Sequence, residues 1–283
     1  MTVTQTLHNG LAAIELRSPD GATVVVTLHG GHVVSWKTAD SQEEQLYLSP
    51  TSAFANGKAI RGGVPVIFPQ FSDRGPLVRH GFARTRSWKL LSTGVDAQEA
   101  FACLRLSNDD ETRALWPHAF ELDLVLRVGG NGLLMELSCH NTGDASFAFS
   151  CALHTYLRVH DIAKVHVQGL CGLSYRNAVD GTSATQATQL LQPQGELDRI
   201  YQDVTEPLKV VEPAARHTVH VTQSGFQDVV VWNPGAARAA TLSDLAPGEW
   251  RNLLCVEAAR IATPVRLTAG QRWTGMQRLS VSA

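Results

Sequence analysis

The chain has few charged residues, no long hydrophobic run and no strong excess of either charge. Asp, Glu, Lys and Arg make up 18% of its 283 residues, and the formal net charge is −2. A protein that binds nucleic acid non-specifically presents a basic face, which this balance does not provide. No apolar stretch approaches the roughly 20 residues of a membrane-spanning helix, and the N-terminus lacks the charged start and apolar block of a signal peptide. We expect a cytoplasmic protein that binds neither nucleic acid nor membrane.

Cysteine is also scarce and forms no recognisable pattern. Disulfide scaffolds use even numbers of cysteines, and structural zinc sites use closely spaced ones. Here the cysteines are five, widely scattered and never in a CxxC pair: Cys103, Cys139, Cys151, Cys171 and Cys255. We therefore expect reduced thiols and no structural metal site.

Helical periodicity is nearly absent, and alternation of apolar and polar residues takes its place. In residues 120–128 every second side chain is apolar. Shorter runs of the same kind are 133–140, 164–168, 218–222 and 265–268. Turn-forming clusters such as 129–132 and 141–144 separate the runs, and only 108–115 favours a short helix with an Asn or Asp cap. This pattern predicts an all-β antiparallel sandwich or barrel, formed as one domain over residues 1–283.

Residues 60–88 are unusually rich in arginine. They combine glycines, prolines and aromatics with basic side chains that include Arg61, Arg74, Arg79, His80 and Arg84. The guanidinium group offers a planar fork of donors that suits phosphate, and aromatic faces suit the apolar side of a sugar ring. The segment indicates an anionic or hydroxyl-rich ligand, but it does not by itself indicate a reaction.

His154 lies in an apolar run, 151–159, that predicts a strand. By parity Tyr156 and Arg158 share its face, which gives that face the polar lining of a strand beside a pocket. Histidine titrates closest to neutral pH and exchanges protons readily. Two readings stay open: a catalytic imidazole, or a buried one that only satisfies a backbone carbonyl.

Glu257 is the single carboxylate in the apolar run 253–259. Burying an unpaired carboxylate is costly, so a buried Glu257 should have a partner or a chemical role. The alternative is a glutamate at the end of a strand that faces water.

Taken in order, several blocks of the sequence resemble the aldose 1-epimerase superfamily, most closely its hexose-6-phosphate mutarotase branch. Each block is weakly specific, whereas the ordered set over roughly residues 25–275 is strongly specific. The blocks are GGHVVSW (30–36), AIRGGVPVIFPQF (59–71), HGFAR (80–84), LHTYLRV (153–159), LDRIY (197–201), VVVWNPG (229–235) and LLCVEAA (253–259).

The resemblance implies a galactose mutarotase-like β-supersandwich with its ligand on the concave face of a large antiparallel sheet. It places the catalytic histidine at His154 and the catalytic glutamate at Glu257, and it requires no metal or cofactor. It also implies the binding of a small phosphosugar. The residues that it assigns to this binding are Arg61, Arg84 and Asp198. In the branch a glutamine commonly precedes HGFAR, whereas this chain has Arg79 there.

These assignments lead to a mechanistic hypothesis. Glu257 acts as base on the C1 hydroxyl and His154 as acid on the ring oxygen, while His80 and Asp198 orient sugar hydroxyls and Arg79 contacts sugar or phosphate. A nearby carboxylate should keep His154 protonated near neutral pH.

Two other functions remain open from the sequence alone. One is an aldose 1-epimerase for unphosphorylated sugars, and the other is a non-catalytic carbohydrate-binding module. The sequence gives no indication of the oligomeric state.

Overall fold

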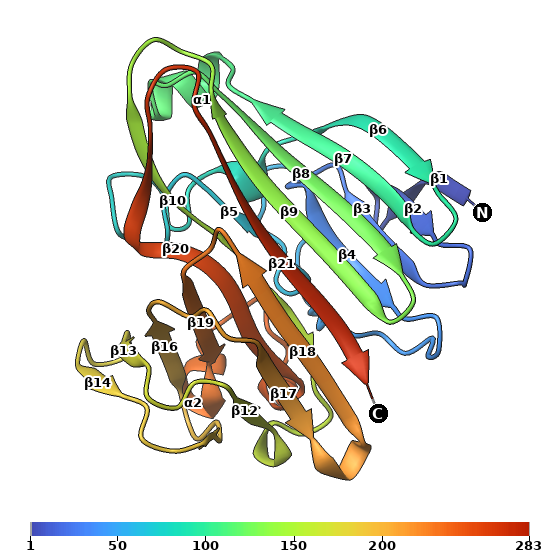
Figure 1. Ribbon diagram of the computed structural model, residues 1–283, viewed down its shortest axis with the longest axis vertical. Helices are drawn as coiled ribbons and strands as arrows, with labels where there is room; N and C mark the ends of the chain where they lie inside the picture. Colours follow the sequence, from blue (N-terminus) through green and yellow to red (C-terminus); the bar gives the residue numbers. More distant parts are fainter. Residues whose placement is uncertain (1, 283) are drawn as a thin grey trace.

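Antiparallel strands are the main elements of the computed structural model, which describes residues 2–282. They form three sheets of four, eight and nine strands. Figure 1 shows the long strands β8, β9 and β21 lying side by side across the molecule. The predicted all-β antiparallel class is therefore confirmed.

The nine-stranded sheet holds most of the predicted strands. Its spatial order is β15 (Leu190–Leu191), β12 (His166–Gln168), β17 (Leu208–Glu212), β18 (His217–Ser224), β21 (Arg272–Ser282), β9 (Gly132–Asn141), β8 (Phe120–Gly129), β7 (Ala100–Ser107) and β6 (Lys89–Val95). Along β8 the alternate apolar residues predicted from 120–128 are buried. The prediction for 164–168 was too long, because Ile162–Lys164 forms a 3₁₀ turn and only the last three residues of the run pair as a strand.

The eight-stranded sheet carries the candidate site residues. Its order is β14 (Ser183–Thr185), β13 (Ser174–Asn177), β16 (Leu197–Tyr201), β19 (Asp228–Asn233), β20 (Leu253–Leu267), β10 (Phe147–Leu153) and β5 (Val66–Ile67), and β11 (Tyr156–Arg158) also pairs with β20. The apolar run 253–259 and the alternating run 265–268 belong largely to one long strand, β20. A third sheet contains β1 (Thr2–His8), β2 (Leu11–Arg17), β3 (Thr23–Thr27) and β4 (His32–Lys37).

The strand predicted over 151–159 is interrupted at His154 and Thr155. β10 pairs with β5 through Leu153, but the chain next to His154 is the irregular segment that contains Pro65. Proline has no N–H to give to a ladder. The N–H of His154 donates to the Pro65 carbonyl (3.0 Å), and regular pairing resumes only at Tyr156.

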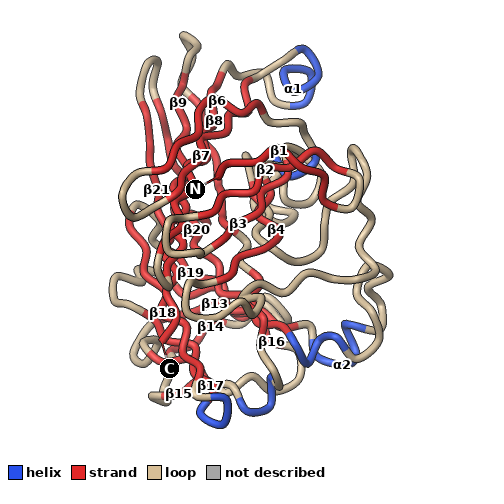
Figure 2. Tube along the Cα trace, turned by 90° about the vertical axis from the view of Figure 1, so that its right-hand side faces the viewer, coloured by secondary structure: helices blue, strands red, loops and turns tan. Residues whose placement is uncertain are grey.

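Helices are few and short. They are α1 (Asp110–Leu115), α2 (Gly235–Ala239) and the 3₁₀ turns η1 (Ala83–Thr85), η2 (Ile162–Lys164), η3 (Pro213–Ala215) and η4 (Glu249–Asn252). α1 confirms the predicted helix: Asp109 caps it by accepting from the Thr112 N–H (2.7 Å). α1 and α2 lie at opposite ends of the molecule (Figure 2). Among residues 2–282 the helices are all too short to cross a membrane.

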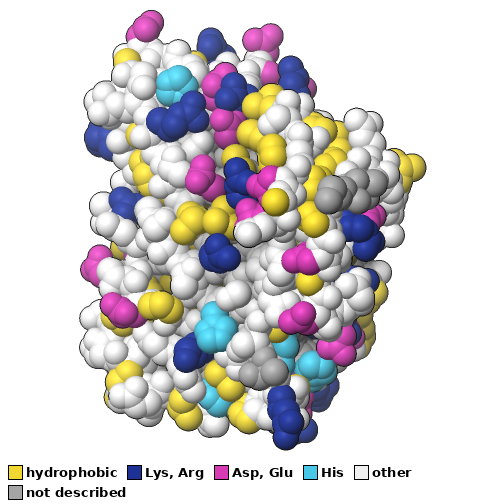
Figure 3. Space-filling model, turned by 45° about the vertical axis from the view of Figure 1, so that its right-hand side comes forward, with side chains coloured by type: hydrophobic (Ala, Val, Ile, Leu, Met, Phe, Trp, Pro, Cys, Tyr) yellow, Lys and Arg dark blue, Asp and Glu magenta, His cyan; other side chains and the backbone are white. Residues whose placement is uncertain are grey.

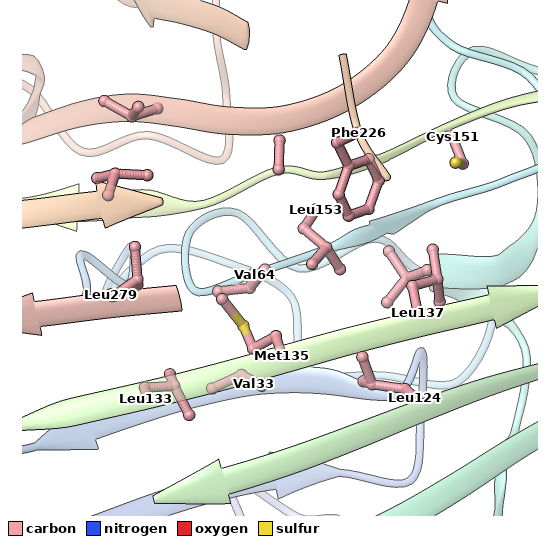
Figure 4. Packing of buried hydrophobic residues seen from close by; sticks show 14 of the residues in the cluster. Val33, Val64, Leu124, Leu133, Met135, Leu137, Cys151, Leu153, Phe226 and Leu279 are labelled. Atoms are coloured by element: carbon pink, nitrogen blue, oxygen red, sulfur yellow. The ribbon is translucent and has the colours of Figure 1, made fainter. Parts of the chain in front are cut away.

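The main hydrophobic core fills the space between the sheets. Its members come from all three sheets and are nearly inaccessible to solvent. Figure 4 shows part of this cluster, which includes Val33, Leu124, Leu133, Met135, Leu137, Cys151, Leu153 and Leu279. This core covers one face of the eight-stranded sheet. The opposite face of the sheet is therefore available to line a cavity.

Candidate active site

A row of four side chains from neighbouring strands lies across the outer face of the eight-stranded sheet. The pairing of β16, β19 and β20 places Asp198 opposite Trp232 and Trp232 opposite Cys255. The pairing of β11 with β20 then places Tyr156 opposite Cys255. Residues two apart on a strand point to the same face, so the adjacent row two residues along belongs to this face as well.

The adjacent row contains both predicted catalytic residues. Ile200 pairs with Val230, and Val230 pairs with Glu257. The registers of β10 and β11 against β20 leave His154 opposite Glu257. Strand register therefore brings together two residues that lie far apart in the sequence.

These rows form the floor of a cavity of about 520 Å³. Its walls come from the arginine-rich segment, from the loop before β16 and from the region of α2. The lining residues are Arg61, Phe71, Ser72, Arg74, Arg79, His80, Arg84, His154, Tyr156, Ala178, Val179, Glu196, Asp198, Ile200, Val230, Trp232, Arg238, Leu242 and Glu257. All seven site residues expected from the sequence thus border one cavity.

His154 and Glu257 form a buried acid–base pair. The Nε2 atom of His154 is 3.3 Å from Oε1 of Glu257, and the two residues are 8% and 1% exposed. Within the described residues, Glu257 Oε2 and His154 Nδ1 have no hydrogen-bond partner. The pair therefore places an imidazole nitrogen and a carboxyl oxygen side by side at the cavity that both residues line.

Burial disfavours charge on both members of the pair. It raises the pKa of Glu257 well above its usual value and lowers the pKa of His154 well below its own, an effect strengthened by His80, Arg61 and Arg84. The favoured form is therefore a neutral pair with its proton on Glu257. The expectation that His154 is protonated was wrong for this cavity, because desolvation and nearby cations outweigh the attraction of one carboxylate.

His80 is held in a strained backbone conformation beside this pair. Its φ is 68°, in the left-handed region that non-glycine residues rarely adopt. Its Nδ1 accepts from the Ser72 N–H (3.3 Å), so the neutral ring carries its proton on Nε2. Burial, and next Arg84, lower the pKa of His80, and its ring centroid is 5.6 Å from that of His154. His80 is thus a neutral donor at the cavity wall.

Gly81 allows the chain to turn at this point. Its φ is 67°, and an added Cβ would lie 2.2 Å from the Phe68 carbonyl oxygen. Only glycine fits such an approach, so the HGFAR block positions His80 through its backbone as well as its side chains.

Arg61 is connected to the His154 imidazole through Tyr156. Its Nη1 donates to the Tyr156 hydroxyl (3.0 Å), and its Nη2 is 3.1 Å from Asp244. The Tyr156 ring is stacked on His154, with centroids 4.7 Å apart and planes 9° apart. An anion bound to Arg61 would therefore be linked to the acid–base pair through the side chains of Arg61 and Tyr156.

Arg84 and Arg79 differ in their surroundings. Arg84 is largely enclosed, donates from Nη2 to the Arg79 carbonyl (2.9 Å), and has a pKa lowered chiefly by burial. Arg79 pairs with Asp73 (2.7 Å) and keeps 55% of its side chain exposed. Arg84 is placed to hold a ligand inside the cavity, whereas Arg79 lies at its rim.

Asp198 lies at the far end of the floor from Tyr156 and is mostly buried. Burial raises its pKa to about 6, an effect opposed by the positive charge of Arg79. It can accept hydrogen bonds as a carboxylate above that pH and donate one below it.

Comparisons with known proteins agree with this geometry. Residues 12–280 match the family model described as "Aldose 1-epimerase". The chain belongs to the aldose 1-epimerase family. It is accordingly an epimerase, an isomerase with a small-molecule sugar as its substrate.

Several sequence relatives carry the name "Putative glucose-6-phosphate 1-epimerase". The one from Cenchrus ciliaris is 34% identical over 97% of this chain and 85% of its own length. The one from Escherichia coli is 35% identical over 85% of this chain and 81% of its own length.

Solved structures share the whole fold. A "putative mutarotase" from Salmonella typhimurium has a TM-score of 0.91 at 29% identity, covering 99% of this chain and 93% of its own. A galactose mutarotase-like protein from Clostridium acetobutylicum has a TM-score of 0.75 at 13% identity, covering 100% and 98%. The galactose mutarotase-like fold implied by the sequence is thus confirmed.

Several cavity residues were not among the predicted site residues. Arg74 belongs to the arginine-rich segment, and Tyr156 shares the face of His154, so both had a signal in the sequence. Trp232 and Arg238 had weaker signals, because their positions depend on strand order and on the loop after β19. Arg158 has the parity of His154 but is exposed and does not line the cavity.

Proposed function

We propose that this epimerase interconverts the α and β anomers of a hexose 6-phosphate, such as glucose 6-phosphate. The observation that carries the proposal is the His154–Glu257 pair on the floor of a cavity with arginines on its walls. The pair supplies acid–base chemistry, and the arginines supply donors suited to a phosphate. The family and the names of its relatives support this substrate class.

The reaction needs one base and one acid at the sugar ring. A proton transfer from Glu257 to His154 across their 3.3 Å contact converts the neutral pair into carboxylate and imidazolium. Glu257 then takes the proton of the C1 hydroxyl, the C1–O5 bond breaks, and His154 protonates O5. After rotation about C1–C2, O5 attacks the other face of the aldehyde, O5 returns its proton to His154, and Glu257 protonates the new C1 oxygen.

The phosphate binds to Arg61 and Arg84 in this proposal. Both lower the pKa of His154 through their positive charge, and a bound dianion offsets that charge. Substrate binding thereby favours the imidazolium needed for the forward step. His80 donates from Nε2 to a sugar hydroxyl, Asp198 accepts from another, and Arg79 contacts the ligand at the rim.

The test compares two substrates in a coupled mutarotation assay. We expect efficient conversion of glucose 6-phosphate and slow conversion of glucose. Arg61→Ala should lower kcat/KM for glucose 6-phosphate by about 10- to 100-fold, the cost of a lost charged hydrogen bond, and should affect glucose little. Arg158→Ala, an exposed arginine outside the cavity, is the matched control and should leave both rates unchanged.

The alternatives give different results in this assay. Equal or better conversion of glucose, with equal losses in Arg61→Ala, would identify an aldose 1-epimerase for unphosphorylated sugars. Absence of activity on both substrates, with binding retained, would identify a carbohydrate-binding module.

A further inference from the structure

Cys255 lies beside the acid–base pair and has no part in the proposed reaction. It is two residues from Glu257 on β20 and is fully buried. It packs with Tyr156 and Trp232, the aromatic side chains of the cavity floor. Its thiol therefore belongs to the same face of the sheet as His154 and Glu257.

The three side chains bring three potential metal ligands together. One ligand atom from each of His154, Cys255 and Glu257 lies within 4.8 Å of the other two. The strand geometry explains this convergence, because alternate residues of one strand and a cross-strand neighbour project from one face as a triangle. A metal ion with bonds of about 2.0 to 2.3 Å to nitrogen, oxygen and sulfur would bind once the three side chains close around it.

The donor set selects the class of metal. A thiolate and an imidazole favour Zn²⁺ and metals of similar softness, whereas Mg²⁺ and Ca²⁺ require oxygen ligands. Thiolate and carboxylate together neutralise a divalent ion, which suits a buried position. Three protein ligands leave a fourth position open, and His154 and Glu257 direct it toward the cavity that they line.

We propose that Zn²⁺ binds to His154, Cys255 and Glu257 and thereby switches off the acid–base pair. Binding removes the proton of the Cys255 thiol and the proton shared by His154 and Glu257. About two protons are therefore released for each ion bound near neutral pH. Metal binding itself does not depend on the proposed function, whereas the loss of activity rests on it.

The binding test uses Co²⁺ and Zn²⁺ on the full chain. All variants carry Cys171→Ser, because Cys171 is exposed and could bind metal on its own. In the Cys171→Ser protein, which keeps Cys255, Co²⁺ should produce a thiolate-to-cobalt charge-transfer band that saturates at one equivalent. Zn²⁺ should remove this band by displacing Co²⁺. Calorimetry in buffers of different ionisation enthalpy should report about two protons released per Zn²⁺.

Cys255→Ala should abolish the band and weaken Zn²⁺ binding by about 100-fold or more, since even outer-shell changes cost 10- to 100-fold. Cys151 is a buried cysteine of β10 outside the cluster, so Cys151→Ala is the matched control. This variant should retain the charge-transfer band and the Zn²⁺ affinity. If Cys255→Ala unfolds, Cys255→Ser preserves the side-chain size and should still lose the band. A band that persists without the Cys255 thiol, or no stoichiometric binding before substitution, would overturn the proposal.

Activity provides a separate readout. Stoichiometric Zn²⁺ should inhibit anomer interconversion, a chelator should restore it, and Cys255→Ala should be resistant. Zn²⁺ bound at this site without loss of activity would support the metal site and contradict the catalytic roles of His154 and Glu257. Failure of the metal site and failure of the proposed function are thus distinguishable.

Discussion

The carboxyl group of Glu257 is buried, and burial disfavours its charged form. It is 1% exposed, with one oxygen near His154 and the other without a hydrogen-bond partner among residues 2–282. A buried ionisable group of this kind usually lowers stability and is retained for its chemistry.

Glu257→Gln removes the base but preserves shape and hydrogen-bonding capacity. We expect the rate of anomer interconversion to fall by at least ~100-fold, as proton transfer is lost, while calorimetry still detects hexose 6-phosphate binding. The melting temperature should be unchanged or higher, because a buried carboxyl is replaced by a neutral amide. Glu196→Gln, an exposed carboxylate at the cavity wall, serves as control. Near-normal rates in Glu257→Gln would exclude the assigned role.

Asp198 should make sugar binding dependent on pH. Its pKa is raised to about 6 by burial, so the folded protein holds this proton more tightly than the unfolded chain. The stabilising effect of this group is fully present below the unfolded pKa and is lost as pH rises through about 6. Acceptance of a sugar hydroxyl has the opposite dependence, because it needs the carboxylate, so KM should rise as pH falls through about 6.

The measurement is KM against pH for the unchanged protein and for Asp198→Asn. The phosphate of the substrate also titrates near pH 6, so the informative quantity is the difference between the two profiles. In Asp198→Asn, KM should still change with pH, but only through the titration of the substrate phosphate. Identical profiles would show that Asp198 does not control binding.

At the scale of elements, the break between β10 and β11 is held from the opposite sheet. The Thr155 hydroxyl donates to Gln277 Oε1 on β21 (2.6 Å), and Gln277 Nε2 donates to the Val256 carbonyl (3.0 Å). Both polar side chains are fully buried. This connection fixes the segment next to His154 against β20.

Gln277→Leu should leave the Thr155 hydroxyl buried and unpaired. We expect a loss of about 1 to 3 kcal/mol in the free energy of unfolding, measured by urea denaturation, and a lower kcat because His154 adjoins Thr155. The double variant Thr155→Val with Gln277→Leu removes both partners and should be less destabilised than Gln277→Leu alone. A single variant as stable as the unchanged protein would contradict this role of the buried pair.

Element prediction from the sequence succeeded where the pattern was local. The alternation in 120–128 and the cap of α1 depend only on residues close together in the chain, and both were confirmed. The interruption at His154 was missed, because it depends on Pro65 arriving beside the strand from a distant segment.

At the scale of the molecule, positive charge is concentrated at the cavity and not over the surface. The net charge is −2, and the face in Figure 3 shows cationic and anionic side chains interspersed. Five arginines nevertheless line one cavity. The attraction for an anionic ligand is therefore local.

This distribution predicts a substrate-specific salt effect. Raising the ionic strength from about 0.05 M to about 0.5 M shortens the screening length several-fold, so KM for glucose 6-phosphate should rise several-fold. KM for glucose, which carries no charge, should change little, and the melting temperature should respond weakly. The same dependence for both sugars would argue against a phosphate site formed by these arginines.

The fold class, the family and most of the residues that line the cavity could be predicted from the sequence alone, because they follow from alternation and ordered motifs along the chain. The extent of one domain over residues 1–283 and a cytoplasmic location stay predictions. The burial that disfavours charge on His154 and Glu257, and the position of Cys255 beside them, depend on the tertiary structure. Protonation depends on burial and on charges brought in from other segments, and convergence depends on register between strands far apart in sequence. Neither is encoded in a local pattern.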